Sequence, residues 1–258
     1  MGLAMIRGAI ASGYIKPSKV IAFDVNRTKT DSLRNEHPDI TIASEAAEVA
    51  AEADIVFLAV KPQFAREAIR SISPEMRGKG LVSIVAGWTF DMLAEELSAR
   101  DVGVLRVMPN IPAMVGEGMT ALCDDTTLTR EQFDFVHGFF NAIGKTVILP
   151  ERLFDGVTAI SGSSPVMVYM LIEALADAGV REGITRNCAF EMAAQTVLGS
   201  ALMVLSSDTH PESLKDAVCS PGGTAIEAVA QLEQRGFRSA VIEAMHASAE
   251  KSRKMGRQ

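Results

Sequence analysis

The sequence predicts an α/β fold with a doubly wound parallel sheet over residues 1–150, followed by an all-helical domain over residues 151–258. Two observations support this division. Short apolar, β-branched runs alternate with helical patterns up to about residue 150, and beyond that point the strand-like runs stop. No Gly/Ser-rich segment lies between the two parts, so we expect a change of architecture there and not a flexible linker.

The strand-like runs of the first part are continuously apolar, as expected for parallel strands that are buried on both faces. They lie at Lys19–Asp24, Asp54–Val60, Gly80–Ala86 and Val102–Met108. Helical patterns lie between them, at Thr28–Glu36, Ala46–Glu52, Gln63–Ile72 and Phe90–Leu97. The second part has helical patterns at Pro165–Gly179, Arg186–Leu205, Gly223–Arg235 and Arg238–Lys254. Because so small a domain cannot bury the apolar faces of these last helices alone, they predict packing against a second copy of the chain.

The composition narrows the class of function. The 258 residues carry a formal net charge of −7, which argues against a nucleic-acid-binding protein. No apolar run approaches the roughly 20 residues that span a bilayer, so we expect no membrane segment. The three cysteines, Cys123, Cys188 and Cys219, are widely spaced. They predict neither a disulfide framework nor a metal site, and they fit a cytoplasmic protein.

A helical pattern begins at Gly2 with no strand before it. In a dinucleotide-binding Rossmann fold, a strand and a Gly-rich turn precede the first helix, whose N-terminus binds the pyrophosphate. An acidic residue is expected about 20 positions later, and Asp24 lies 22 positions after Gly2. We therefore interpret Gly2 as the last glycine of such a turn and expect the first strand to precede Met1 in a longer chain. The alternative is that Gly2 is an ordinary surface glycine.

Three successive strands of the first part end in residues suited to a ligand, and the carboxyl ends of parallel strands form the binding crevice of this fold class. The residues are Val60-Lys61-Pro62, Ala86-Gly87 and Asn110. Small residues let a nicotinamide ring approach the backbone, and an amide both donates to and accepts from a carboxamide. Ordinary turns and tight packing explain each motif taken alone; their recurrence favours the binding role.

Two further motifs precede helices of the second part. Ser161–Pro165 has N-cap chemistry, with Ser followed by Pro at the first helical position. Pro221–Thr224 exposes several backbone N–H groups at a helix start, an arrangement that binds a carboxylate or a phosphate, although a plain turn would also explain it. We find no Ser/His/Asp triad, paired carboxylates or His-rich metal set in the sequence.

Taken together and in this order, the motifs AVKPQ, VAG, RVMPNIP, SGSSP…EALADAGV and SPGGT resemble those of pyrroline-5-carboxylate reductases, over essentially the whole chain from Gly2. The resemblance implies a Rossmann domain followed by a helical dimerisation domain, and a homodimer that in some members forms a larger ring of dimers. It implies NADPH or NADH as the hydride donor, a small-molecule substrate, 1-pyrroline-5-carboxylate, and L-proline as the product.

The resemblance also implies roles for individual residues. Val60, Lys61, Pro62, Ala86 and Gly87 should line the cofactor, and Asn110 should lie near its nicotinamide. Glu151, Ser220, Gly222, Gly223, Thr224 and Ala225 should surround the substrate, with its carboxylate bound mainly by backbone N–H groups. The threonine hydroxyl that bonds the ring nitrogen in the family falls at Ala225 here, so Thr224 is the remaining candidate for that catalytic contact. Ala217 replaces the asparagine that is common in the family.

The predicted reaction is hydride transfer to a cyclic imine. A protonated imine takes its proton from solvent, so no strong general acid is required. Asp24 would bind the ribose hydroxyls of NADH, whereas Asn26 and Arg27 could bind the 2′-phosphate of NADPH, which leaves the preference open. A β-hydroxyacid dehydrogenase is disfavoured because Pro165–Gly179 contains no lysine. A non-catalytic relative that binds a small carboxylate, or a reductase of a different imine, remains an alternative.

Overall fold

The computed structural model describes residues 1–97 and 101–255. By its contacts the chain divides into two compact units, one formed by Met1–Ser163 with Ala247–Gln258 and the other by Ser164–His246. The sequence led us to place the domain boundary after residue 150, whereas in the structure the next residues pack with the first unit. The Ser252 hydroxyl, near the end of the chain, donates to Asp155 at 2.6 Å, and this bond helps to join the C-terminal segment to the first unit.

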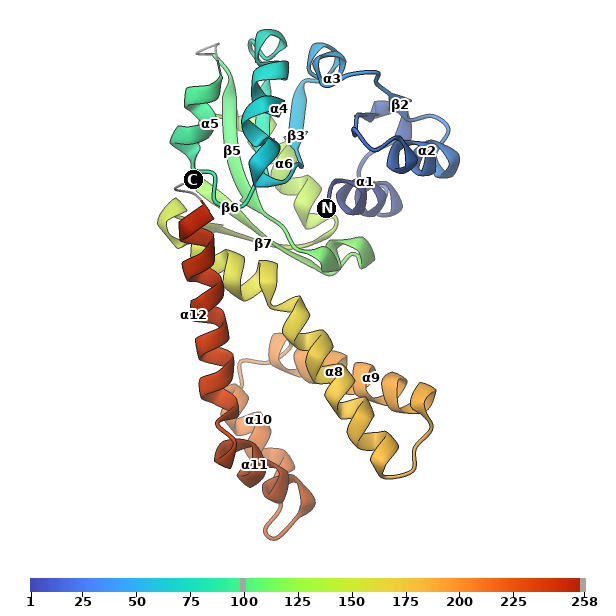
Figure 1. Ribbon diagram of the computed structural model, residues 1–258, viewed down its shortest axis with the longest axis vertical. Coiled ribbons are helices and arrows are strands. Elements are labelled where there is room, and N and C mark those ends of the chain that lie inside the picture. The colour runs from blue at the N-terminus through green and yellow to red at the C-terminus, as the bar shows by residue number, and fades with distance from the viewer. Residues whose placement is uncertain (98–100, 256–258) are drawn as a thin grey trace. The chain divides into compact units, whose positions relative to one another are not determined.

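The first unit contains a mixed five-stranded sheet with the strand order β3-β4-β5-β6-β7 (Figure 1). The strands are β3 (Ile55–Leu58), β4 (Gly80–Ser83), β5 (Gly103–Met108), β6 (Gly118–Thr126) and β7 (Gly144–Leu149). The pairs β3–β4 and β4–β5 are parallel, β6 runs antiparallel to β5, and β7 is parallel to β6. A separate parallel pair is formed by β1 (Ile21–Ala22) and β2 (Thr41–Ile42).

Each of the four predicted strands contains an observed strand, and the α/β class is confirmed. The sequence interpretation missed β2, β6 and β7, and it expected only parallel strands where the structure has an antiparallel β6. The omissions have physical reasons: β2 has two residues, and β6 ends in the polar run Asp124–Thr126. The strands β1 and β3 belong to different sheets and are not hydrogen-bonded to each other. A strand preceding Met1 stays a prediction.

Helices connect the strands of both sheets, and those that pack on the five-stranded sheet lie on both of its faces. They are α1 (Gly2–Ala11), α2 (Arg27–Glu36), α3 (Ala46–Glu52), α4 (Ala65–Ile72), α5 (Phe90–Glu96), α6 (Arg130–Asn141) and α7 (Phe154–Val157). The sequence interpretation missed α6, although it begins with a complete capping box, in which Thr129 and Gln132 satisfy each other's backbone N–H groups.

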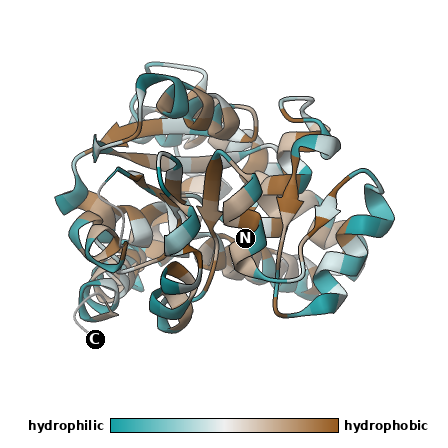
Figure 2. Cartoon of the chain, turned by 90° about the horizontal axis from the view of Figure 1, so that it is seen from above, coloured by the Kyte–Doolittle hydropathy of each residue, from teal (hydrophilic) through white to brown (hydrophobic). Residues whose placement is uncertain are grey.

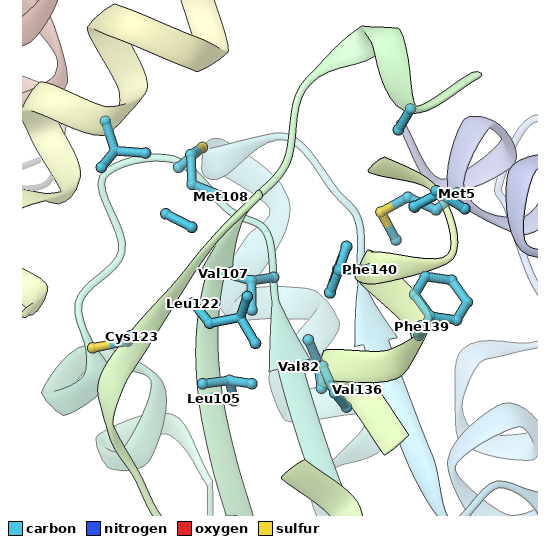
Figure 3. Close-up of a cluster of buried hydrophobic side chains, with 14 of the residues drawn as sticks. Met5, Val82, Leu105, Val107, Met108, Leu122, Cys123, Val136, Phe139 and Phe140 are labelled. Carbon is cyan, nitrogen blue, oxygen red and sulfur yellow. The ribbon is translucent and has the colours of Figure 1, made fainter. Parts of the chain in front are cut away.

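Two hydrophobic clusters show that the sheet is buried on both faces. In one cluster Val82 and Leu105 of the sheet pack with Phe140 of α6 (Figure 3). In the other, the neighbouring residues Leu81 and Val104 pack with helices α4 and α5. Successive strand residues point to opposite faces, so consecutive positions in β4 and β5 serve different clusters. The strands are therefore hydrophobic on both sides, and the doubly wound prediction is confirmed. Figure 2 shows several strands in the brown of hydrophobic residues.

The second unit is all-helical, as predicted. It contains α8 (Pro165–Arg181), α9 (Arg186–Leu205), α10 (Pro211–Val218), α11 (Thr224–Gln234) and the part of α12 (Phe237–Met255) that precedes Ala247. Helices α8 and α9 pack closely, because a Cβ placed on Gly179 would lie 3.3 Å from that of Ala189. Large apolar side chains elsewhere on these helices are open to solvent within one chain, including Met170 and Leu202.

Candidate active site

The N-terminus of α1 lies against the end of β3. A Cβ placed on Gly2, the first residue of α1, would lie 3.3 Å from the Cβ of Ala59, which directly follows β3. The first N–H groups of a helix have no acceptor within the helix and carry positive charge density, so they bind anions. The structure thus brings Gly2 next to Ala59, the residue before the Val60–Pro62 segment, and binding of a pyrophosphate there stays a prediction.

Asp24 and Asn26 form the turn that follows β1. The Asp24 carboxylate accepts the Asn26 N–H at 2.8 Å and binds the Lys29 ammonium group at 2.9 Å. The Asn26 side chain in turn accepts the Thr28 N–H at 3.1 Å and caps α2. Asn26 therefore has a structural function. Both oxygens of the half-exposed Asp24 have partners within the chain, and the Arg27 guanidinium donates to the Ser44 carbonyl at 3.2 Å, so the predicted contacts of Asp24 and Arg27 with a ribose and its phosphate stay a prediction.

The loops after β3 and β4 present backbone and small side chains. Lys61 is exposed and Pro62 starts a short 3₁₀ helix, Pro62–Phe64. Gly87 is buried and has a φ of 77°, a left-handed conformation that favours glycine. The turn at Ala86–Gly87 therefore depends on its glycine, as a close approach of a planar ring to the backbone would require.

Asn110 is buried and uses both ends of its amide within the protein. Its Oδ1 accepts the Met119 N–H at 2.8 Å, and its Nδ2 donates to the Ser161 carbonyl at 3.0 Å. The side chain therefore joins the end of β5 to the start of β6 and to the segment before α8. One amide hydrogen remains for a ligand, so the predicted proximity to the nicotinamide stays a prediction.

The segment before α8 differs from the expected capped helix start. Residues Thr158–Ser163 form a π-helical turn, and Ser164 has helical backbone angles without a side-chain cap bond. The helix thus continues from α7 through a π turn into α8. Such turns occur often at functional sites, and this one brings Ser161 to Asn110.

Glu151 lies in the first unit and bonds to two elements of the sheet layer. Its Oε1 accepts the Phe90 N–H at 2.7 Å and the Arg106 Nη1 at 3.0 Å. Arg106 is almost fully buried, and its guanidinium lies 4.7 Å from the centroid of the Phe154 ring. The carboxylate predicted to contact the substrate is therefore held in an ion pair within this unit, and its substrate role stays a prediction.

A cavity of about 180 Å³ lies beside Ala86. It is lined by hydroxyl groups and one ammonium group, from Thr158, Ser163, Ser248, Lys251 and Ser252, with Met255. The Ser248 hydroxyl donates to that of Ser163 at 3.0 Å. Sequence reasoning missed the three residues of α12, although positions 248, 251 and 252 share one helix face and their i, i+3, i+4 spacing was a readable signal.

The Ser220–Ala225 segment forms the predicted turn at the start of α11. Gly222 has a φ of 65°, and the Gly223 N–H donates to the Ser220 carbonyl at 3.0 Å. A Cβ placed on Gly223 would meet the Ser220 hydroxyl, which would have to rotate, and would lie 3.1 Å from the Ser220 carbonyl oxygen, so glycine fits this turn with the least rearrangement. No side chain caps α11, so the N–H groups of its first residues have no acceptor within the helix. Binding of the substrate carboxylate by these groups stays a prediction.

Comparison with known proteins identifies the family. A family model described as pyrroline-5-carboxylate reductase dimerisation matches residues 151–255. A second, described as NADP oxidoreductase coenzyme F420-dependent, matches residues 1–87. The two family models thus match separate parts of the chain.

The dimerisation match explains the apolar helices of the second unit. By length and composition, the helices Glu151–Arg181 and Arg186–Leu205 could cross a membrane, and only 11% of each apolar window is buried within the chain. A helix that packs against another subunit has the same composition and the same exposure when one chain is viewed alone. The chain forms a homodimer, and an interface built from these helices would account for their exposed apolar surface.

Pyrroline-5-carboxylate reductases are similar to this chain over nearly its whole length. The pyrroline-5-carboxylate reductase of Escherichia coli is 44% identical over 258 residues, covering 100% of this chain and 95% of the relative. That of Arabidopsis thaliana is 39% identical over 257 residues, covering 99% and 92%. A crystal structure of the Plasmodium falciparum pyrroline carboxylate reductase with NADP bound superposes with a TM-score of 0.89 at 33% identity, covering 98% and 93%. The chain belongs to the pyrroline-5-carboxylate reductase family.

Proposed function

We propose that the chain reduces the cyclic imine 1-pyrroline-5-carboxylate to L-proline with NADPH or NADH, using the strand ends of the first unit for the cofactor and the Pro221–Thr224 turn for the substrate carboxylate. The observation that carries this proposal is the start of α11, where no side chain caps the helix and the N–H groups of its first residues, Thr224 and Ala225, have no acceptor within the helix. Membership of the reductase family gives that anion its chemical identity.

The cofactor site would be made of backbone surfaces. The start of α1 at Gly2 would take a phosphate, Asp24 the ribose, and the Val60–Pro62 loop the adjoining part of the nucleotide. Ala86 and Gly87 would face the nicotinamide. Asn26 contributes through the shape of its turn, because its side-chain oxygen caps α2.

When bound, the reduced nicotinamide supplies the hydride, which adds to the imine carbon. The residues of the chain then have to bind and orient the substrate. The N–H groups of Thr224 and Ala225, at the start of α11, would hold the carboxylate and so fix the ring against the nicotinamide. The Gly223 N–H already donates to the Ser220 carbonyl. The Thr224 hydroxyl is exposed within one chain and is our candidate for the bond to the ring nitrogen, whose proton comes from solvent.

The direct test is consumption of NADPH and of NADH by the purified protein in the presence of 1-pyrroline-5-carboxylate, with chromatographic identification of L-proline. We expect one proline for each cofactor oxidised. A protein that binds proline analogues but oxidises neither cofactor above background would favour the second candidate, a non-catalytic carboxylate-binding dimer. The observation that favours this second candidate is Ala225, which stands where the family has a threonine.

Two further properties belong to this proposal. A larger ring built from the homodimers would be seen as a defined mass above that of the dimer in sedimentation experiments. The cytoplasmic location rests on cysteine usage: Cys123, Cys188 and Cys219 are all free thiols, as is usual in a reducing compartment.

A further inference from the structure

The loop that carries Ala86 and Gly87 is short and is fixed at both ends. On one side β4 ends at Ser83, which lies opposite Arg106 in the parallel ladder. On the other side the chain enters α5 at Phe90, whose N–H donates to the Glu151 carboxylate at 2.7 Å. Between these two fixed points lie the positive-φ Gly87 and the buried Trp88.

One ion pair connects the two fixed points. The oxygen of Glu151 that accepts the Phe90 N–H also accepts the Arg106 Nη1 at 3.0 Å. Ser83, Gly87, Phe90, Glu151 and Arg106 therefore form a closed circuit of covalent and hydrogen bonds around the turn. Neither residue of the pair is adjacent to the turn in sequence, since Glu151 lies 61 positions beyond Phe90.

The pair is held rigidly. The Arg106 side chain is 4% exposed, whereas that of Glu151 is 27% exposed. Among the residues that the structure describes, Glu151 is the one carboxylate paired with this guanidinium, and the buried Arg106 Nε has no hydrogen-bond partner. The Phe154 ring covers the guanidinium at 4.7 Å. A buried cation with a single anionic partner has little freedom to move away from it.

From this circuit we propose that Glu151 and Arg106 are positioning residues that hold the Ala86–Gly87 turn in the shape that binds the nicotinamide cofactor. The inference rests on the proposed function, which places the nicotinamide at this turn. Glu151 then acts on cofactor binding through Phe90, and not by contact with the substrate.

The chain carries its own probe for this turn. Trp88 is the single tryptophan of the sequence, follows Gly87 directly and is 6% exposed. Its emission reports the burial of the turn in the free protein. Energy transfer from Trp88 to bound NADPH reports cofactor affinity, so one fluorophore measures both.

The test compares three variants of the purified protein. Glu151→Leu removes the acceptor, whereas Glu151→Gln keeps one side-chain oxygen, which can accept both the Phe90 N–H and the Arg106 N–H but carries no charge. Glu96→Leu is the matched control, because Glu96 lies at the other end of α5 and pairs with Arg66 and Arg70, each at 2.8 Å.

We expect the Trp88 emission of free Glu151→Leu to shift to longer wavelength and its Kd and KM for NADPH to rise roughly tenfold or more. Glu151→Gln should retain the emission and the NADPH affinity of the wild type while unfolding at a lower denaturant concentration, because Arg106 loses its counter-charge. Glu96→Leu should lower only the stability of the protein and leave the Trp88 emission and the NADPH affinity unchanged. These results would show that the geometry of the Ala86–Gly87 turn depends on the side-chain oxygen at position 151. They would also show that the free energy of unfolding depends on the negative charge at that position.

Two results would overturn the inference. One is a Glu151→Leu protein whose Trp88 emission and NADPH affinity equal those of the wild type. The other is a Glu151→Gln protein whose KM for 1-pyrroline-5-carboxylate alone rises, which would place the carboxylate on the substrate. Failure of wild-type protein to bind NADPH would refute the proposed function instead, and the emission of the free variants would still decide whether the ion pair holds the turn.

Discussion

Gly87→Ala is the substitution that most sharply separates the cofactor-binding role of a turn from its contribution to stability. Gly87 has a φ of 77°, and an L-residue in this left-handed region costs about 1–2 kcal/mol. Alanine also restricts the unfolded chain, which offsets about 0.4–1 kcal/mol. We therefore expect a net loss of about 1 kcal/mol in the free energy of unfolding, or about 2–4 °C in Tm for a protein of this size.

Gly78→Ala provides the matched control. Gly78 has a φ of 72°, lies in an exposed loop before β4, and a Cβ placed on it would have no atom within 4 Å. The conformational cost is the same at the two glycines. The two variants should lose similar stability, but only Gly87→Ala should lose cofactor affinity, by about tenfold, because a small displacement at a binding surface weakens a well-oriented complex.

Urea unfolding and NADPH titration, both followed through Trp88, provide the two measurements. The reasoning is refuted if Gly87→Ala loses stability but binds NADPH as tightly as Gly78→Ala does. That result would show that the turn after β4 supports the fold without contacting the cofactor.

The remaining predictions concern four other features. Thr224→Val should lower kcat/KM for 1-pyrroline-5-carboxylate about tenfold through loss of one hydrogen bond, with Thr224→Ser close to wild type; equal kinetics would remove Thr224 from the site. Asp24→Asn should weaken NADH more than NADPH by about tenfold or more, and an unchanged ratio of kcat/KM values would exclude the ribose contact. Met170→Glu, at a side chain that is 63% exposed in one chain, should yield monomers in sedimentation at micromolar concentration because the interface would bury an unpaired charge; persistent dimers would place α8 outside it. Burial raises the pKa of the Cys123 thiol, so this thiol should stay protonated at neutral pH and react with a thiol reagent only on unfolding; rapid labelling in the native protein would contradict its burial.

The sequence was sufficient for the α/β class of the first unit and for four of its strands, because parallel strands buried on both faces are continuously apolar. The runs around Val56, Val82 and Leu105 are apolar on both faces, and the observed clusters on the two sides of the sheet explain why. The later strands β6 and β7 lack that signal. They lie at the other end of the sheet from β3, and several β7 residues are only partly buried, so their composition is mixed.

The sequence predicted which loops form the candidate site, but it did not predict the hydrogen bonds that their side chains make. The strand ends and the glycine turn at Gly222–Gly223 were visible because glycine and proline leave local signatures. The bonds made by Asn110 and Glu151 join residues 51 and 61 positions apart, and nothing local encodes such partners. For the same reason Lys251, beside Ala86 in the cavity, was not predicted, since its position depends on where the last helix ends.

The most direct test is a structure of the dimer bound to NADPH and a stable, non-reacting analogue of proline. We predict that the carboxylate of the analogue accepts hydrogen bonds from the N–H groups of Thr224 and Ala225, with its ring against a nicotinamide at Ala86–Gly87. A carboxylate bound elsewhere, with the glycine turn remote from the nicotinamide in every subunit, would contradict the account.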